Sequence, residues 1–491
     1  MKNHYYKTKM VKMGQWSLLP GDSETWHGEH TGRYFQKLFG VSKYLLCLGN
    51  LKNGFQYMYV AQENLDALFS QIGKINSKNY KALEKKFKTF YPLVKKAKQI
   101  SAHNLNSASL SNEQLAEQFF KIRDRIHHLA IFDQFTWLGE EYWTPKIEKV
   151  LTGKLGLKKA SEEYNKVLFA LTKPEEISTT LLEKQAVIEQ AIKVKNRKQN
   201  LKAAGKILAN KFGWLPVFCY GEPWTGGHYE KELSSVVKKD AKVLLADLKK
   251  LKDYTKVRNE ELNFYVKKYK IKPKDLQVFI DFGLAIDTRN EAEYFVSFGG
   301  FYLIPLYKEI AKRLCLSVKQ VRFLTEKEML NAVVGKADAD KLLAEKGQWV
   351  GWGFEKSTNK RINFSSQETQ KLFKYIESYV KPIQGGDEGK GVCASPGKVV
   401  GKIRIIPSPE QNNKVKDGDI LVTFATTTDY LPAMKRASAI ITEVGGLTCH
   451  AAVVSREFGI PCIVALANAM KNFKDGEMVE VDANKGVVKK L

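Results

Sequence analysis

The stretch that most restricts the possible fold is EVGGLTCHAAVVSREFGIPCIV, at residues 443–464. An apolar run ends at Val444, and Gly445 and Gly446 follow it. Because glycine reaches backbone angles that other residues avoid, this pair permits a tight turn. Thr448 is a favourable helix N-cap, and AAVVSREF continues as a helix. The sequence therefore predicts a strand, a tight turn and a helix in direct succession.

The expected helix also has a defined end. Gly459 suits the C′ position, and Pro461 stops any continuation. With Thr448 as the N-cap, Cys449 and His450 occupy the first helical turn. The amides of a first turn have no partners within the helix, and the helix dipole adds partial positive charge there.

This position suits a histidine that carries a phosphoryl group. Positive potential disfavours the imidazolium form, so the ring stays neutral and nucleophilic near pH 7. Once phosphorylated, the same histidine presents a dianion where a helix N-terminus accommodates anions. The alternative is that His450 is a capping or core histidine. A ring that stays buried away from solvent would contradict a shuttle of phosphoryl groups, so we expect an accessible ring.

Short β-rich runs surround this stretch and predict a compact α/β domain over residues 391–491. The segment KPIQGGDEGK at 381–390 lacks periodicity, and its proline, glycines and charges predict a hinge linker. The expected strands are KVVGKIRII (398–406), DILVTF (419–424), SAIITEV (438–444), CIVAL (462–466) and MVEVDANKGVV (478–488).

Helical periodicity dominates residues 76–380, whereas residues 1–75 mix both kinds of pattern. GFQYMYV at 54–60 predicts a strand, and residues 112–135 and 234–254 predict helices. The expected fold class is therefore multidomain α+β, with a mainly α-helical N-terminal body and a smaller C-terminal domain.

The formal net charge of +26 lies mostly in the N-terminal body, because residues 381–491 hold 15 Lys or Arg against 12 Asp or Glu. A solvated, lysine-rich helix face explains this excess. The alternative is a surface that attracts a phosphorylated ligand or a nucleic acid. Arginine is sparse and no basic motif is interleaved with aromatic residues, so nucleic-acid binding is disfavoured.

Other classes of protein are disfavoured as well. No apolar run reaches 18 residues, and the N-terminus lacks a continuous apolar segment, so we expect no membrane span and no signal peptide. The six cysteines form no CxxC pair, which argues against a disulfide framework and indicates the cytoplasm. His27, Glu29 and His30 lie close together in WHGEH, but they lack a further ligand, and no metal site is expected.

The stretch GGLTCHAAVVSREFGIPCIV resembles the phosphohistidine signature of the mobile domain of phosphoenolpyruvate (PEP)-utilising enzymes. This domain occurs in phosphoenolpyruvate synthase, pyruvate phosphate dikinase and rifampicin phosphotransferase. The resemblance extends from Gly391 to the C-terminus, through ASPGKVVGKIRII (394–406), DGDILVTFATTTDYLPAMKRASAIIT (417–442) and DGEMVEVDANKGVV (475–488). It implies a swivelling β/β/α domain.

The resemblance implies that His450 accepts a phosphoryl group at one active site and delivers it at another. Gly445, Gly446 and Thr448 would shape the pocket around the ring, and Arg456 would help to neutralise the phosphate or remain an exposed helix charge. Cys449 belongs to the same supporting set, and we expect it to be a small packing residue and not a reactive thiol. The residues Thr426, Thr427, Thr428 and Asp429 match a loop of the family without an assigned role.

The relatives named above carry an ATP-grasp domain, and no such domain is recognisable in this sequence. The resemblance therefore implies a separate ATP-grasp subunit that uses ATP and Mg²⁺, while the recognised domain itself binds no cofactor. Residues 76–380 resemble the helical acceptor-binding domain of rifampicin phosphotransferase-like proteins, which implies a small-molecule phosphoryl acceptor. The alternatives are a phosphocarrier or regulatory module without acceptor chemistry and a basic nucleic-acid-binding protein.

Overall fold

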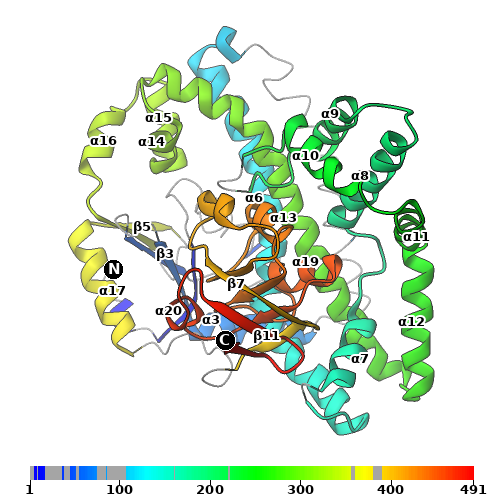
Figure 1. The fold of residues 1–491 in the computed structure, drawn as a ribbon. Helices are drawn as coiled ribbons and strands as arrows, with labels where there is room; N and C mark the ends of the chain where they lie inside the picture. Colours follow the sequence, from blue (N-terminus) through cyan, green and yellow to red (C-terminus); the bar gives the residue numbers. More distant parts are fainter. Residues whose placement is uncertain are drawn as a thin grey trace. The chain divides into compact units, whose positions relative to one another are not determined.

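The structure is a computed structural model, and it describes residues 5–7, 9–16, 36–37, 45–50, 55–74, 85, 107–159, 161–218, 222–354, 360–379 and 390–491 (Figure 1). The chain forms two compact units. The first unit combines Met1–Gly139 with Phe298–Gln384, and the second combines Glu140–Ser297 with Gly385–Leu491. These units divide the chain differently from the ranges expected from the sequence, because helical periodicity does not reveal which segments pack together.

The first unit contains a five-stranded antiparallel sheet. Its strand order is β1 (Met10–Trp16), β3 (Phe55–Ala61), β2 (Leu45–Asn50), β4 (Trp349–Phe354) and β5 (Arg361–Phe364). Leu46 and Leu48 of β2 are buried with Leu372 and Ile376. The expected N-terminal segment 1–75 is thus not a separate unit, since β2 pairs with β4, about 300 residues further along the chain.

Helices complete the first unit and connect it to the second. They are α3 (Gln62–Lys74), α14 (Val318–Phe323), α15 (Glu326–Val333), α16 (Ala339–Glu345) and α17 (Ser366–Tyr379). The long helices α6 (Asn112–Glu148) and α13 (Pro273–Arg313) each contribute residues to both units. Arg123 and His127 of α6 approach the buried Glu326 at 3.8 and 3.5 Å.

The second unit begins with a helical part. It comprises the π-helix Lys149–Lys154, α7 (Glu162–Thr172), α8 (Thr179–Lys195), α9 (Leu201–Phe212), α10 (Gly226–Val236), α11 (Ala241–Lys252) and α12 (Tyr254–Lys268). The helical pattern expected over 234–254 is divided between two helices. Helix α10 ends at Val236, and Asp240 starts α11 by accepting a hydrogen bond from the Lys242 amide at 2.7 Å.

The C-terminal domain of the second unit is built on a seven-stranded mixed sheet. Its order is β12 (Val487–Lys490), β11 (Met478–Asp482), β7 (Lys398–Ile405), β8 (Ile420–Thr423), β9 (Ala439–Thr442), β10 (Cys462–Val464) and β6 (Val392–Ser395). The four central strands are parallel, and the outer pairs are antiparallel. Each β-rich run noted in the sequence forms a strand, and the expected α+β class is confirmed.

Two apolar layers enclose this sheet. On one side, Ile403, Ile420 and Ile441 pack with Leu466 and Phe473, near the short helix α20 (Ala469–Asn472). On the other side, the sheet carries α18 (Leu431–Met434) and α19 (His450–Phe458). This second layer continues into buried residues of the helical part, among them Ala186, Leu208 and Tyr229.

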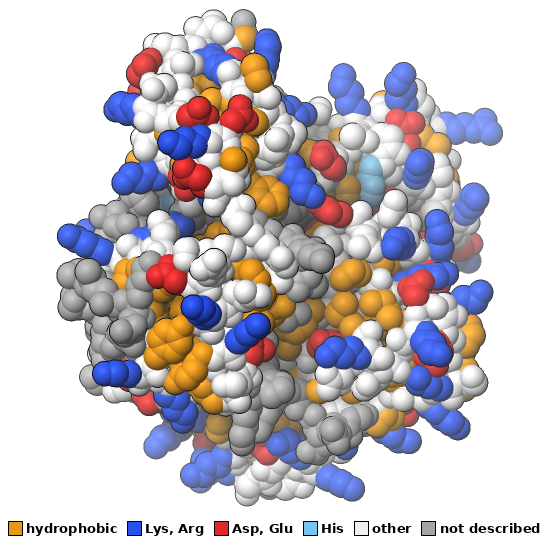
Figure 2. All heavy atoms as spheres, turned by 90° about the vertical axis from the view of Figure 1, so that its left-hand side faces the viewer, with side chains coloured by type: hydrophobic (Ala, Val, Ile, Leu, Met, Phe, Trp, Pro, Cys, Tyr) orange, Lys and Arg blue, Asp and Glu red, His pale blue; other side chains and the backbone are white. Residues whose placement is uncertain are grey.

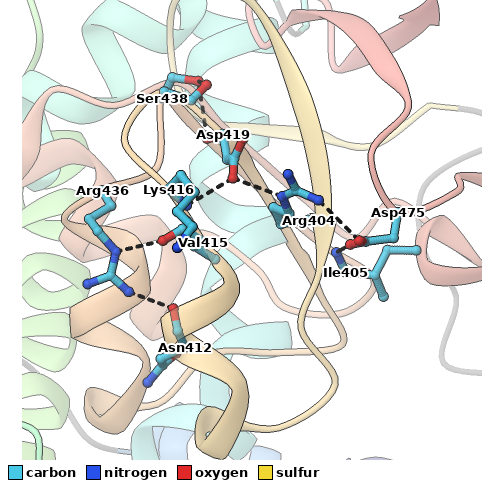
Figure 3. A network of polar contacts seen from close by, with 10 residues as sticks. Arg404, Ile405, Asn412, Val415, Lys416, Asp419, Arg436, Ser438 and Asp475 are labelled. Atoms are coloured by element: carbon cyan, nitrogen blue, oxygen red, sulfur yellow. Dashed lines mark hydrogen bonds and ion pairs between the residues drawn. The ribbon is translucent and has the colours of Figure 1, made fainter.

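A network of hydrogen bonds and ion pairs holds the loops before β8 and β9 in place (Figure 3). The Asp419 carboxylate accepts hydrogen bonds from Arg404 Nε and the Lys416 amide, both at 2.9 Å. Arg436 Nε donates to the Val415 carbonyl at 2.8 Å. Because buried polar groups require partners, this network fixes the register in which the strands start.

The remaining expectations concern membrane spans, the hinge and the basic surface. None of the helices in the described ranges is long and apolar enough to cross a membrane. Residues 381–389 lie outside the described residues, so the hinge stays a prediction. On the face shown in Figure 2, Lys and Arg side chains are scattered among acidic and uncharged ones and do not form one continuous patch.

Candidate functional site

The turn between β9 and α19 depends on Gly445. Its φ is +120°, a backbone conformation that residues with a side chain rarely adopt. A Cβ at this position would lie 2.8 Å from the Cys449 Sγ. The Cys449 amide then donates to the Gly446 carbonyl at 3.2 Å. The Gly-Gly pair therefore lets the chain reverse tightly against the start of the helix, as the sequence predicts.

The start of α19 differs by one residue from the expectation. The N-cap is Cys449, with extended backbone angles, and no side chain caps the helix. The prediction of Thr448 as the N-cap is wrong, because its hydroxyl and carbonyl both accept hydrogen bonds from Arg289 instead. His450 is the first residue of the helix, and Gly459 ends it at φ +69°, as expected.

His450 is anchored through one of its ring nitrogens. Nδ1 lies 3.1 Å from the Thr426 Oγ1, whereas Nε2 forms no hydrogen bond with any described residue. Burial, and secondarily the positive charge of Arg289, lower the pKa of His450 from 6.5 to about 3. The ring is therefore neutral at pH 7, as a nucleophilic imidazole must be.

The imidazole is buried, with 2% of the residue exposed. The expectation of an accessible ring is therefore wrong for this arrangement of the second unit. The local strand–turn–helix geometry leaves the amides and side chains of the first helical turn accessible to solvent, and it contains no information on distant segments. The loop before His450 is bonded by Arg289 of α13, which lies 159 positions before Thr448 in the chain.

One face of α13 meets two loops of the C-terminal domain. Arg289 NH1 donates to the Thr448 carbonyl at 3.1 Å and to its Oγ1 at 3.2 Å. Two turns later, the Ser297 Oγ lies 2.7 Å from the Thr428 Oγ1, and both residues are fully buried. Residues eight positions apart share one face of a helix. The helix thus contacts the loop before His450 and the loop that contains Thr426.

Arg456 and Cys449 hold the site together in ways that the sequence left open. Arg456 NH2 donates to the Leu447 carbonyl at 2.8 Å, and its guanidinium lies 5.2 Å from the centroid of the Phe169 ring. The hydrogen bond joins α19 to the loop that precedes it, and the ring contact joins α19 to α7. Cys449 packs against the buried apolar layer, in agreement with a packing role.

A buried ion cluster lies beside α18. Lys435 Nζ is 2.8 Å from the Glu183 Oε1 of α8 and 3.1 Å from the Glu232 Oε1 of α10. It also lies 4.5 Å from the centroid of the Trp224 ring. Burial and the nearby Glu232 raise the pKa of Glu183 to about 7, against the opposing effect of Lys435. This cluster joins the C-terminal domain to the helical part within the second unit.

Sequence reasoning missed Arg289, Ser297 and Lys435. The spacing of Arg289, Glu293 and Ser297, each four residues apart, marks one polar face on an otherwise apolar helical pattern. This was the available signal, although it did not identify the partner. No group of three or more His, Cys, Asp or Glu side chains in the described part of the chain is placed to hold a metal ion. His27 and His30 lie outside that part.

The C-terminal domain is similar to a known family of domains. The family described as PEP-utilising enzyme, mobile domain, matches residues 415–486, which include α19 and His450. The C-terminal region of this chain is therefore similar to the PEP-utilising enzyme mobile domain.

Relatives of this region are phosphoenolpyruvate synthases. The chain is 56% identical over 99 residues to a probable phosphoenolpyruvate synthase of Archaeoglobus fulgidus, covering 20% of this chain and 13% of the relative. It is 42% identical over 147 residues to the phosphoenolpyruvate synthase of Pyrococcus furiosus, covering 29% and 18%. For the enzyme of Deinococcus radiodurans, the identity is 44% over 104 residues, covering 20% and 13%. The chain thus matches only a small part of the length of these synthases.

Proposed function

We propose that this protein is a phosphotransferase component in which His450 is transiently phosphorylated. One observation carries the proposal. A neutral imidazole stands at the start of α19, with Nδ1 held by Thr426 and with Nε2 making no hydrogen bond to a described residue. Its place in a PEP-utilising enzyme mobile domain supports the same chemistry.

The ring chemistry follows from these contacts. With the proton on Nδ1, that nitrogen donates to the Thr426 hydroxyl, and Nε2 presents its lone pair. Attack of Nε2 on a phosphorus atom forms a P–N bond while the bond to the leaving group breaks. The leaving group departs with the electron pair of that bond. The position of His450 at the start of α19 favours negative charge nearby, because first-turn amides have no partners within the helix.

The phosphoryl donor is an ATP- or PEP-using site, which we place on a separate ATP-grasp subunit that binds ATP and Mg²⁺. The acceptor is a small molecule that binds to the helical part of the chain. Because the ring is buried and α13 bonds the two loops beside it in this arrangement, transfer to another site requires the contacts at Arg289 and Ser297 to open. The linker predicted at 381–390 provides the freedom for such a movement.

The test is direct labelling of the protein. We expect acid-labile, base-stable radiolabel when the protein is incubated with γ-³²P-ATP, Mg²⁺ and an ATP-grasp partner, or with labelled PEP. The label should disappear in His450→Ala. It should persist in His228→Ala, which removes a half-buried histidine whose pKa is lowered by burial, to about 4.

Two results would contradict the proposal. One is a label of undiminished intensity in His450→Ala, and the other is no label on the wild-type protein from either donor. Passage of the label from the protein to a metabolite identifies an enzyme component. Retention of the label with no small-molecule product would instead identify a phosphocarrier or regulatory module.

A further inference from the structure

The guanidinium of Arg289 is a positive charge that influences the protonation of the proposed nucleophile, His450. Arg289 is 9% exposed and bonds Thr448, two residues before His450. Burial lowers the pKa of His450, and the charge of Arg289 lowers it further. Arg289 belongs to α13, which lies outside the region matched by the mobile-domain family. The helical part of the second unit therefore supplies a charge to the histidine site.

This charge has the right sign for both forms of the histidine. A nearby cation disfavours protonation of the free ring and so keeps the nucleophile neutral. The same cation favours a phosphoryl dianion on Nε2. Arginine suits this second task because its planar guanidinium matches phosphate oxygens in a two-pronged geometry.

The side chain is also oriented for such a contact. Arg289 Nε lies 3.6 Å from the Glu293 Oε1, one helical turn further along α13. This ion pair holds the Nε edge of the guanidinium toward α13, and the NH1 group then points to the loop before α19. NH1 contacts a neutral carbonyl and a hydroxyl there, and these are weaker acceptors than a phosphoryl oxygen.

We propose that Arg289 binds the phosphoryl group of phosphorylated His450, so that α13 is a docking station for the loaded mobile domain. This inference rests on the proposed function of His450. It assigns a phosphoryl-binding residue to the helical part of the chain. In this state NH1 turns from the Thr448 oxygens to a phosphoryl oxygen, and phosphorylation strengthens the contact between α19 and α13.

The test loads His450 without any partner protein by using phosphoramidate, a small phosphoryl donor. Nε2 attacks the phosphorus atom and forms the new P–N bond. The P–N bond of the reagent, whose nitrogen is protonated, breaks, and ammonia leaves with the electron pair of that bond. The extent of loading is measured by ³¹P NMR at mildly alkaline pH, where phosphohistidine is stable. His450→Ala should show no phosphohistidine at this position.

Hydrogen exchange of peptides from α13 and α19 then reports docking. Each protein is compared with its own unphosphorylated form, so a general loss of stability in a variant cancels. In the wild type, phosphorylation should slow exchange of these peptides about tenfold. In Arg289→Met it should accelerate exchange about tenfold, because an uncompensated dianion disfavours the buried position. Arg289→Lys should show an intermediate response, since it keeps the charge and loses the planar fork.

The matched control is Arg258→Met. Arg258 lies on α12 and also donates to a carbonyl oxygen, that of Lys173 at 3.2 Å, but it contacts no loop of the mobile domain in the interactions described above. Its response to phosphorylation should equal that of the wild type. If Arg289→Met does not fold, Arg289→Lys and Arg289→Gln provide the same comparison.

The outcomes separate the two proposals. No phosphohistidine at His450 in the loaded wild type overturns the proposed function. Phosphohistidine that accelerates exchange equally in the wild type and in Arg289→Met overturns only the role of Arg289, because phosphorylation then releases the domain. The same holds if phosphorylation slows exchange by an equal factor in both.

Discussion

Lys435→Met is the substitution whose effect can be worked out most fully. Lys435 is the cation between the carboxylates of Glu183 and Glu232, and the Glu183 side chain is only 1% exposed. Burial opposes the charge on Lys435, but the two carboxylates outweigh it and raise its pKa above 10.5. Methionine keeps the length and apolar character of the side chain and removes the charge. The variant therefore leaves a buried carboxyl group without its counter-ion.

The loss should depend on pH. The pKa of Glu183 rises from 4.5 to about 7 on folding, so the folded protein binds more protons than the unfolded chain between these values. The free energy of unfolding therefore falls as pH rises from 4.5 to 7, and then levels off. Without Lys435, Glu183 keeps its proton to higher pH, and the fall continues at roughly 1.4 kcal/mol per pH unit.

The electrostatic part of the destabilisation is thus close to zero below pH 7 and grows by about 1 kcal/mol per pH unit as the pH rises toward 9. A loss of about 1–3 kcal/mol that does not vary with pH adds to it, because the contacts of Lys435 with Glu232 and the Trp224 ring also disappear.

The assay is urea unfolding between pH 6 and pH 9, followed by hydrogen exchange of peptides from α8, α10 and α18. Lys398→Met is the control, because Lys398 pairs with Glu480 at 3.1 Å on the same domain but is 54% exposed. Its loss should be within about 1 kcal/mol and independent of pH. Equal destabilisation of Lys435→Met at pH 6 and pH 9 would refute the reasoning.

Three further predictions concern the histidine site. Gly445→Ala should lower the free energy of unfolding by roughly 2–3 kcal/mol. Gly459→Ala should lower it by only about 1 kcal/mol, because a Cβ there meets open space. Equal urea midpoints for the two variants would contradict the account of the turn. Ser297→Ala and Thr428→Val should each lower the free energy of unfolding by about 1–2 kcal/mol. The double mutant should lose less than the sum of the two, because the buried hydroxyls bond each other. Strict additivity in urea unfolding would argue against this contact. His450 has a pKa lowered from 6.5 to about 3, so the unfolded chain binds its proton first as pH falls. The wild type should lose about 2 kcal/mol from this group between pH 8 and pH 5, and urea unfolding of His450→Gln should show that this share is gone.

Part of the site follows from neighbouring residues in the chain. The apolar run before Val444, the glycine at 445 and the glycine at 459 each specify a local backbone state, and each is found where it was expected. The N-cap was misplaced by one residue because the Thr448 hydroxyl has a competing partner in Arg289. A local preference of this size is easily reversed by one buried tertiary hydrogen bond.

The amino-acid sequence by itself determined the strand–turn–helix around His450, the class of the C-terminal domain and the strands of its sheet other than β6. These depend on periodicity and on backbone preferences, which act over a few residues. Only the tertiary structure decided that β2 pairs with β4, that α13 bonds the loop before the histidine, and that Lys435 meets Glu183. Such contacts join residues that are 159 to about 300 positions apart, where loop closure and packing choose the partner and no local pattern encodes it.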